Sequence, residues 1–433
     1  MESELEFTGK PYPHWKRRFF TIWTGQAISM LGSQMVGFAI IWYLTEQTGS
    51  ATVLSMASLF SILPAVILGP IAGTFVDRNN RKWIMIVSDL VVGLARLAGV
   101  FLFASGLIQV WHIYLLIFIG NAAGAFQSPA NTASSALMVP KKELSRVAGM
   151  NQALHGALNI VGAPLGALLM SVTTIPVILL IDFATMLLAV IPLFFIPIPQ
   201  PEAKTDSNGA VIKKSFFADL KEGFQFIFSW PGLCILLLIV MMINFLISPA
   251  MNLLPLLVSQ FFGGSEVELA LINSVFGVGM LVGGLILGAW GGFKKRIFTA
   301  YMGLVFSGIG FGFVGLLPPT AFPLAVGLFG LGALMLPLIN GTFHAVFQAS
   351  IPPEIQGRVT SLIGFGSMLA IPIGTAIAGP VSDAIGIQWW FIIGGFSMIL
   401  FGILGFLLPI LRNVESGRQK IDAALEASAE NIE

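Results

Sequence analysis

The segment Gly73-Thr74-Phe75-Val76-Asp77-Arg78-Asn79-Asn80-Arg81-Lys82 separates two long apolar runs in a chain of 433 residues. Its acidic and basic side chains stand out, because only 10% of the residues are charged and 56% are hydrophobic. A transmembrane helix needs roughly 20 apolar residues, so this composition leaves room for about a dozen such helices. We therefore interpret the segment as a short loop at a membrane surface.

Long apolar runs continue along the whole chain, with a mean hydropathy of +0.89. Their length predicts helices, since the strands of a membrane barrel would alternate apolar and polar residues over about ten positions. The expected fold is an all-α membrane protein with twelve transmembrane helices. A window of about 19 residues places these helices near residues 19–44, 51–76, 83–106, 110–138, 143–171, 175–197, 231–259, 267–291, 297–317, 321–349, 355–383 and 388–411.

The distribution of Lys and Arg predicts the orientation, because cytoplasmic loops retain these residues and translocated loops do not. With twelve helices, all but one of the 22 Lys and Arg residues fall on the side of the two termini. The opposite loops carry acidic residues, Glu46, Glu266 and Glu268, with Asp383 at their edge. A different helix count would mix the two sets, so we expect both termini in the cytoplasm. The exception is Arg96, inside the third helix.

One long polar stretch between the termini, residues 197–214, divides the chain into two sets of six helices. Residues 215–230 place Phe side chains opposite a charged face at helical spacing, which predicts a helix lying in the cytoplasmic interface. The alternative is an early start of the seventh transmembrane helix. The expected parts are an N-terminal tail (1–18), a six-helix half (19–197), a linker with the interfacial helix (198–230), a second six-helix half (231–411) and a C-terminal tail (412–433).

The two halves share short sequence features. Val139-Pro140 precedes Arg146 at the start of the fifth helix, and Ile351-Pro352 precedes Arg358 at the same distance at the start of the eleventh. A second basic loop behind a glycine-rich helix end, residues 288–296, corresponds to residues 73–82. These pairs indicate a duplicated six-helix unit. A substrate site is then expected between the halves near the membrane midplane, with alternating access by rocking of one half against the other.

Residues 73–82 resemble the G-x-x-x-D-R-x-G-R-[RK] motif of the major facilitator superfamily, at its expected place between the second and third helices. The resemblance implies a cluster that stabilises the outward-facing state. The glycine would let helices approach closely, and the acidic residue would accept hydrogen bonds at a helix N-terminus. Asn80 replaces the motif's second glycine, which is tolerable because Asn also visits the left-handed region. The expected conformational residues are Gly73, Asp77, Arg78, Arg81 and Lys82.

Three further stretches, residues 22–27, 43–50 and 53–64, look like the macrolide-efflux branch of this superfamily. The resemblance implies a bacterial inner-membrane exporter of antibiotics that is driven by proton antiport. Helix 5 is also loosely similar to the glycine-proline antiporter motif, through Gly156, Gly162, Pro164 and Gly166.

Polar residues inside the predicted helices are expected to face protein or water. In this superfamily the first, fourth, seventh and tenth helices line the cavity, and here these helices contain no carboxylate. A large amphipathic substrate held by aromatic, Met and amide side chains fits such a cavity. The alternative role for each amide is an interhelical hydrogen bond, worth under about 1 kcal/mol. The candidate cavity residues are Trp23, Gln26, Ser29, Met30, Ser33, Asn121, Gln127, Asn244, Asn252, Asn340 and His344.

Three ionisable residues, Asp89, Arg96 and Asp182, lie inside predicted spans, where an unpaired charge costs a few kcal/mol. Arg96 and Asp182 lie at depths that agree within about 5 Å at 1.5 Å per residue, so we expect them to pair. Asp182 is then a candidate proton carrier, because a carboxylate binds protons differently once its partner moves. The alternative is a static structural ion pair. Asp89 is expected to join the Asp77 and Arg81 cluster.

The remaining features exclude several classes of protein. The sequence contains no GxxxxGK[ST] motif for ATP binding and no Cys/His cluster with metal-ligand spacing, and Cys234 is its only cysteine. The net charge of +1 suggests no nucleic-acid partner. We expect a monomeric, cofactor-free secondary exporter of macrolide-like or other amphipathic drugs, with protons and membrane lipid as its other partners. The alternatives are an exporter of a siderophore or another endogenous metabolite and, less favoured, a membrane-embedded lipid-modifying enzyme.

Overall fold

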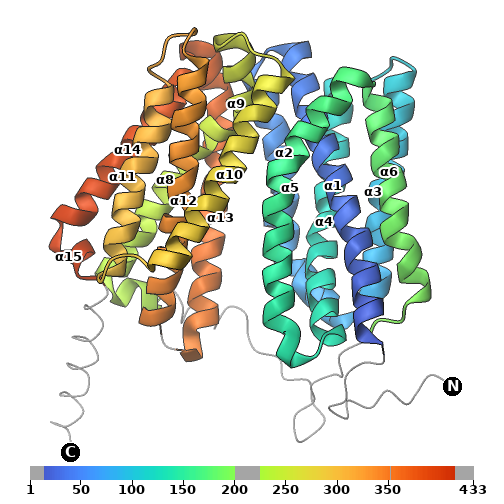
Figure 1. Ribbon diagram of the computed structural model, residues 1–433, viewed down its shortest axis with the longest axis horizontal. Coiled ribbons are helices and arrows are strands. Elements are labelled where there is room, and N and C mark those ends of the chain that lie inside the picture. The colour runs from blue at the N-terminus through green and yellow to red at the C-terminus, as the bar shows by residue number, and fades with distance from the viewer. Residues whose placement is uncertain (1–13, 200–224, 352, 415–433) are drawn as a thin grey trace, which may run out of the picture. The chain divides into compact units, whose positions relative to one another are not determined.

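The computed structural model describes residues 14–199, 225–351 and 353–414, and the secondary structure within these ranges is entirely helical (Figure 1). Eleven of the described helices are long and apolar enough to cross a membrane, and Leu369–Ile385 is a shorter apolar segment. This agrees with the predicted spans within a few residues. The predicted interfacial helix at 215–230 falls mostly outside the described residues, of which 225–229 are helical.

The chain folds into two compact units. The first comprises Met1–Ile41 and Phe60–Thr205, and the second comprises Trp42–Leu59 and Asp206–Glu433. The second unit therefore includes the hairpin at which the first helix ends and the second begins. The helices that supply the first unit are α1 (Trp15–Thr48), α2 (Ala51–Arg78), α3 (Arg81–Ala104), α4 (Val110–Met138), α5 (Leu144–Val172) and α6 (Ile175–Phe195).

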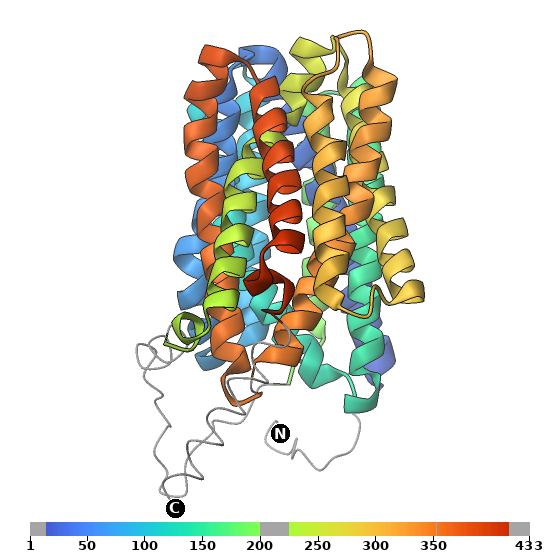
Figure 2. The same ribbon diagram turned by 90° about the vertical axis from the view of Figure 1, so that its left-hand side faces the viewer.

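From residue 231 onward, the described part of the second unit has six long helices and three short elements. In Figure 2, α14 (red) runs between α8 (yellow-green) and α11 (light orange), and it packs against both. The long helices are α8 (Pro231–Asn252), α10 (Glu266–Trp290), α11 (Arg296–Val314), α12 (Phe322–Ser350), α13 (Pro353–Ile385) and α14 (Gln388–Leu407). The short elements are α9 (Leu254–Leu256), the π-helical turn η2 (Leu257–Phe261) and α15 (Pro409–Arg412).

Close packing in the second unit centres on α11. In the most apolar stretch of this helix, 67% of the residues are buried. A Cβ added at Gly310 would lie 2.6 Å from the carbonyl oxygen of Leu328 in α12, and one at Gly315 would lie 2.6 Å from that of Gln388 in α14. Small residues let helix backbones approach to this distance, which is how helices pack where lipid offers no hydrophobic driving force. Large apolar side chains such as Phe101 and Phe195 are instead exposed, as expected for a surface that faces lipid.

Candidate functional site

A polar cavity of about 180 Å³ lies inside the first unit, between α1, α4 and α5. Its lining contains Trp23, Gln26, Met30 and Gln127 from the candidate cavity residues, together with Asn131, Asn151 and His155. The indole Nε1 of Trp23 donates to Asn151 Oδ1 at 2.7 Å, which joins α1 to α5. The described lining has aromatic, Met, hydroxyl and amide side chains and contains no Lys, Arg, Asp or Glu.

Two of the lining residues, Gln26 and the half-buried Gln127, form a hydrogen-bonded ring with the buried Asp89 across α1, α3 and α4. Gln26 Nε2 donates to Asp89 Oδ2 at 3.1 Å, and Gln127 Nε2 donates to Asp89 Oδ1 at 2.7 Å. Gln127 Nε2 also donates to Gln26 Oε1 at 2.8 Å. Asp89 is only 6% exposed and Gln26 only 5%. The sequence predicts Asp89 in a cluster with Asp77 and Arg81; the two amides hold it beside the cavity instead, and the side chain of Asp77 lies outside the described residues.

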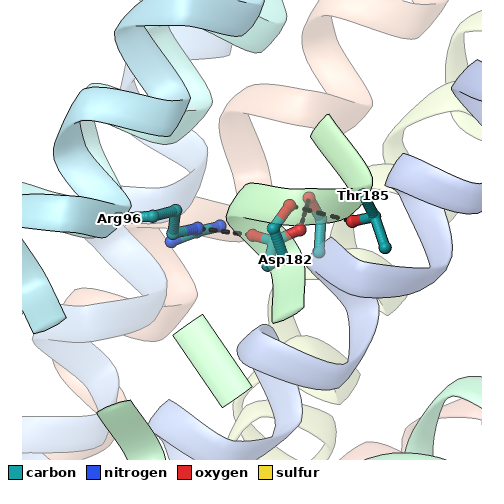
Figure 3. Close-up of polar contacts among 4 residues, drawn as sticks. Arg96, Asp182 and Thr185 are labelled. Carbon is teal, nitrogen blue, oxygen red and sulfur yellow. Dashed lines mark hydrogen bonds and ion pairs between the residues drawn. The ribbon is translucent and has the colours of Figure 1, made fainter. Parts of the chain in front are cut away.

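The second charged site is the predicted ion pair between α3 and α6. Arg96 Nε donates to Asp182 Oδ2 at 2.7 Å, and Figure 3 shows the two side chains pointing toward each other. Ser33 on α1 donates its hydroxyl to Asp182 Oδ1 at 3.2 Å, and a Cβ added at Gly32 would lie 2.7 Å from the same oxygen. The side chains are 13% and 2% exposed, so the pair is nearly removed from water. Its role in transport stays a prediction.

Position 32 therefore requires a glycine, because a Cβ there would overlap the Asp182 carboxylate, and the sequence alone did not show this. Figure 3 also shows Thr185, one turn after Asp182 on α6, whose hydroxyl donates to the main-chain carbonyl of Asp182 at 2.8 Å. Because Thr185 is satisfied within its own helix, the carboxylate oxygens remain for Arg96 and Ser33.

The other candidate cavity residues have more varied surroundings. Asn121 and Asn244 donate to carbonyl oxygens one turn earlier in their own helices, at 2.9 Å each. Asn252 donates to Thr375 Oγ1 at 2.8 Å and so joins α8 to α13. Ser29 is half-buried, and Asn340 and His344 are exposed on α12. Their contact with substrate stays a prediction.

In the segment 73–82, only residues 79 and 80 lie between the ends of α2 and α3, and Asn80 has a different local structure from the one expected. Asn80 has φ −68° and ψ 109°, so it is extended and not left-handed. Its Oδ1 accepts hydrogen bonds from the amides of Lys82 and Trp83 and thereby caps the N-terminus of α3. Asn therefore replaces glycine here because its side chain caps the helix, for which Asn is among the preferred residues.

The motif's basic residues lie at helix ends. Arg81 is buried at 6% exposure and donates from Nη1 to the carbonyl oxygen of Ala133 on α4 at 3.1 Å. Lys82 Nζ donates to the carbonyl oxygen of Phe194 in the last turn of α6 at 3.0 Å, where the helix dipole favours a cation. Arg78 is exposed. A Cβ added at Gly73 would meet no atom within 4 Å, so the close approach predicted at this glycine is not formed within the first unit.

Sequence reasoning missed a capping contact inside the second unit, at the hairpin between α1 and α2. Asp383, near the end of α13, accepts hydrogen bonds from the main-chain amides of Ala51 (2.9 Å) and Thr52 (3.2 Å). The hydroxyls of Thr52 and Ser50 also donate to it, at 2.6 and 3.4 Å. A carboxylate at the N-terminus of α2 is favoured by the helix dipole. No local signal could have paired residues so far apart in the chain.

Among the described residues, no group of three or more His, Cys, Asp or Glu side chains is arranged to hold a metal ion. The fold and the cavity together define a multi-pass membrane protein whose polar site is built from amides and aromatic rings.

Comparison with known proteins gives the class. The sequence profile described as Major Facilitator Superfamily matches residues 22–370 and, in a second match, residues 233–430. The chain is 36% identical over 404 residues to macrolide efflux protein A of Streptococcus pyogenes, covering 93% of this chain and 99% of that protein. It is 35% identical over 326 residues to macrolide efflux protein A of Enterococcus faecalis, covering 75% and 99%. A more distant relative, the multidrug efflux pump Tap of Mycolicibacterium fortuitum, is 24% identical over 89% of this chain and 94% of its own.

Solved structures share the fold at low sequence identity. A bacterial homologue of the iron transporter ferroportin in an inward-facing state superposes with a TM-score of 0.71 at 15% identity, covering 92% of this chain and 99% of that one. A bacterial homologue of the lysosomal transporter Spinster superposes with a TM-score of 0.66 at 14% identity, over 95% and 99%. These structures agree with the predicted twelve-helix fold, and the family profile and the macrolide efflux relatives show that the chain is a solute-efflux transporter and not an enzyme. It belongs to the major facilitator superfamily, in the branch of the macrolide efflux proteins.

Proposed function

We propose that this transporter exports macrolide-like or other large amphipathic compounds across the bacterial inner membrane in exchange for protons, by alternating access. Both termini would lie in the cytoplasm, where the basic loops are predicted. The similarity to macrolide efflux proteins over nearly the whole chain supports this substrate class.

The observation that carries the proposal is the chemistry of the cavity in the first unit. Its described lining offers the Trp23 ring, the Met30 thioether and several amides, with no charged side chain. The lining is half polar and half apolar, which suits a large amphipathic molecule, and Met adapts to varied shapes. At about 180 Å³ the cavity is smaller than pockets for drug-sized ligands, which span about 300 to 1,000 Å³. It would therefore hold only part of such a molecule.

The test is accumulation of a radiolabelled macrolide in drug-sensitive bacteria that express the chain, with and without a protonophore. We expect expression to lower accumulation and the protonophore to abolish the difference. Unchanged accumulation would overturn the substrate class and favour an endogenous metabolite as cargo. Efflux that survives collapse of the proton gradient would overturn antiport.

A matched pair of tryptophans links this assay to the cavity. Trp23→Ala removes a ring from the lining and its hydrogen bond to Asn151, so we expect efflux to fall at least tenfold. Trp111→Ala removes an exposed ring at the start of α4, at 55% exposure, and should leave efflux unchanged. Equal effects of the two substitutions would remove the cavity from the transport pathway.

A further inference from the structure

Asp89 and Asp182 are the buried carboxylates among the described side chains of the first unit, and they differ in the charge of their partners. Asp182 has a guanidinium at 2.7 Å, so its negative charge is already compensated. Asp89 is equally buried, but its hydrogen-bond partners are the neutral amides of Gln26 and Gln127. A buried carboxylate without a cationic partner is the one whose charge a proton can usefully neutralise.

The sequence places several other ionisable groups on α3 and on the neighbouring helices. On α3 itself Arg81 and Arg96 are eight and seven residues distant, which corresponds to about 10 to 12 Å along a helix. His155 of α5 lines the same cavity. The remaining ionisable groups of α1, α3, α4, α5 and α6 are Lys82 on α3, Asp182 on α6, His112 and Tyr114 on α4, Arg146 on α5, and Lys16, Arg17, Arg18, Tyr43 and Glu46 on α1.

Through this ring of hydrogen bonds, the charge of Asp89 determines which atoms of the Gln127 amide face the cavity. Both hydrogens of Gln127 Nε2 are used, one by Asp89 Oδ1 and one by Gln26 Oε1. Its oxygen Oε1 makes no hydrogen bond within the described residues, and the residue lines the cavity. With Asp89 ionised, Gln127 therefore offers an acceptor to a substrate that carries hydroxyl groups.

Protonation of Asp89 reverses this arrangement. A carboxylic acid donates through its O–H, whereas an ionised carboxylate only accepts. On Oδ1 the new O–H would face the N–H donors of Gln127, while Oδ2 still accepts from Gln26, so the Gln127 amide must turn to present its oxygen. Gln127 is the one whose oxygen is available, and turning it withdraws the acceptor from the cavity and exposes N–H groups instead. Proton and substrate then compete, which is the coupling that antiport requires.

We propose that Asp89 binds the exchanged proton and that the Gln127 amide turns when Asp89 is protonated. This turn changes the hydrogen-bonding groups that face the substrate cavity. This rests on the proposed proton antiport and names the residue that performs it. In each cycle the substrate displaces the proton from the Asp89 carboxyl to water in the cavity, and a proton from the other side later displaces the substrate. The O–H bond of the Asp89 carboxyl forms and breaks in this cycle, and no other covalent bond of the protein changes.

The test measures proton release and substrate binding separately on the purified full-length protein in detergent. A hydroxyl-bearing macrolide is added in weak buffer with a pH-sensitive dye, and its binding is followed by tryptophan fluorescence. Wild type should release protons on binding, and its affinity should fall by up to about tenfold per pH unit as the solution becomes more acidic. Asp89→Asn should bind with no release and with affinity independent of pH.

Further variants keep the outcomes distinct. Gln127→Leu should bind at least tenfold more weakly and lose most of the pH dependence, because Asp89 can no longer act on the cavity. Asp89→Glu keeps the carboxyl and should restore proton release, which controls for folding of the Asn variant. Binding without release in wild type would overturn antiport itself. Undiminished release from Asp89→Asn would overturn the assignment of Asp89 and leave antiport intact.

Discussion

Removal of one partner from the Arg96–Asp182 pair gives the largest stability effect that we predict. In Arg96→Met, Asp182 keeps only the hydroxyl of Ser33 at 3.2 Å as a side-chain donor. Because Asp182 is 2% exposed, water cannot replace the lost guanidinium. Breaking a buried pair in this way costs about 3–5 kcal/mol, whereas replacing both partners by apolar side chains is often neutral or stabilising.

The remaining serine hydrogen bond offsets about 1 kcal/mol at most, so we expect a net loss near 3 kcal/mol for Arg96→Met. That loss corresponds to a change of about 100-fold in the unfolding equilibrium. Asp182→Leu together with Arg96→Met should recover most of it, since neither partner then leaves an unpaired buried charge. The measurement is unfolding by SDS in mixed micelles, followed by tryptophan fluorescence.

An exposed ion pair provides the control. Arg146 and Glu143 are 3.9 Å apart and 79% and 27% exposed, and Arg146→Met should cost less than about 0.5 kcal/mol. The double variant of the buried pair should also retain drug efflux, because we assign proton transfer to Asp89. If it unfolds like wild type but exports nothing, the pair is part of the transport mechanism and our reasoning fails.

Three further predictions use the same unfolding assay. Gly32→Ala should cost about 1–3 kcal/mol, because the new Cβ would overlap the Thr185 hydroxyl and the ion-paired carboxylate. Gly37→Ala, in open space on the same helix, should cost nothing, and equal effects would contradict the packing. Asp383→Asn should cost about 1–2 kcal/mol through the cap of α2, whereas a comparable loss in Glu46→Gln would point to surface charge. Asn80→Ala should cost about 1 kcal/mol but Asn80→Gly only a few tenths; the reverse order would disprove the helix cap.

Much of the site was predictable where one helix or one depth decides it. Arg96 and Asp182 are charges at matching depths in apolar helices, so pairing followed from the cost of leaving either alone. Asp89 could not be placed in the same way. Its partners Gln26 and Gln127 come from two other helices, and the rotation of each helix about its axis decides which side chains meet. The left-handed conformation predicted at Asn80 was wrong for a related reason, since Asn is favoured both in left-handed turns and at helix N-termini.

The sequence by itself determined the membrane as solvent, the number of helices and their order along the chain. Those properties depend on the length of each apolar run and on the distribution of Lys and Arg among the loops. Both can be read from the sequence one segment at a time. Only the tertiary structure decided that two amides enclose Asp89, that Gly32 admits Asp182 and that Asp383 caps a helix more than 300 residues earlier. These contacts depend on the distance and rotation between helices, which arise from packing across the whole unit.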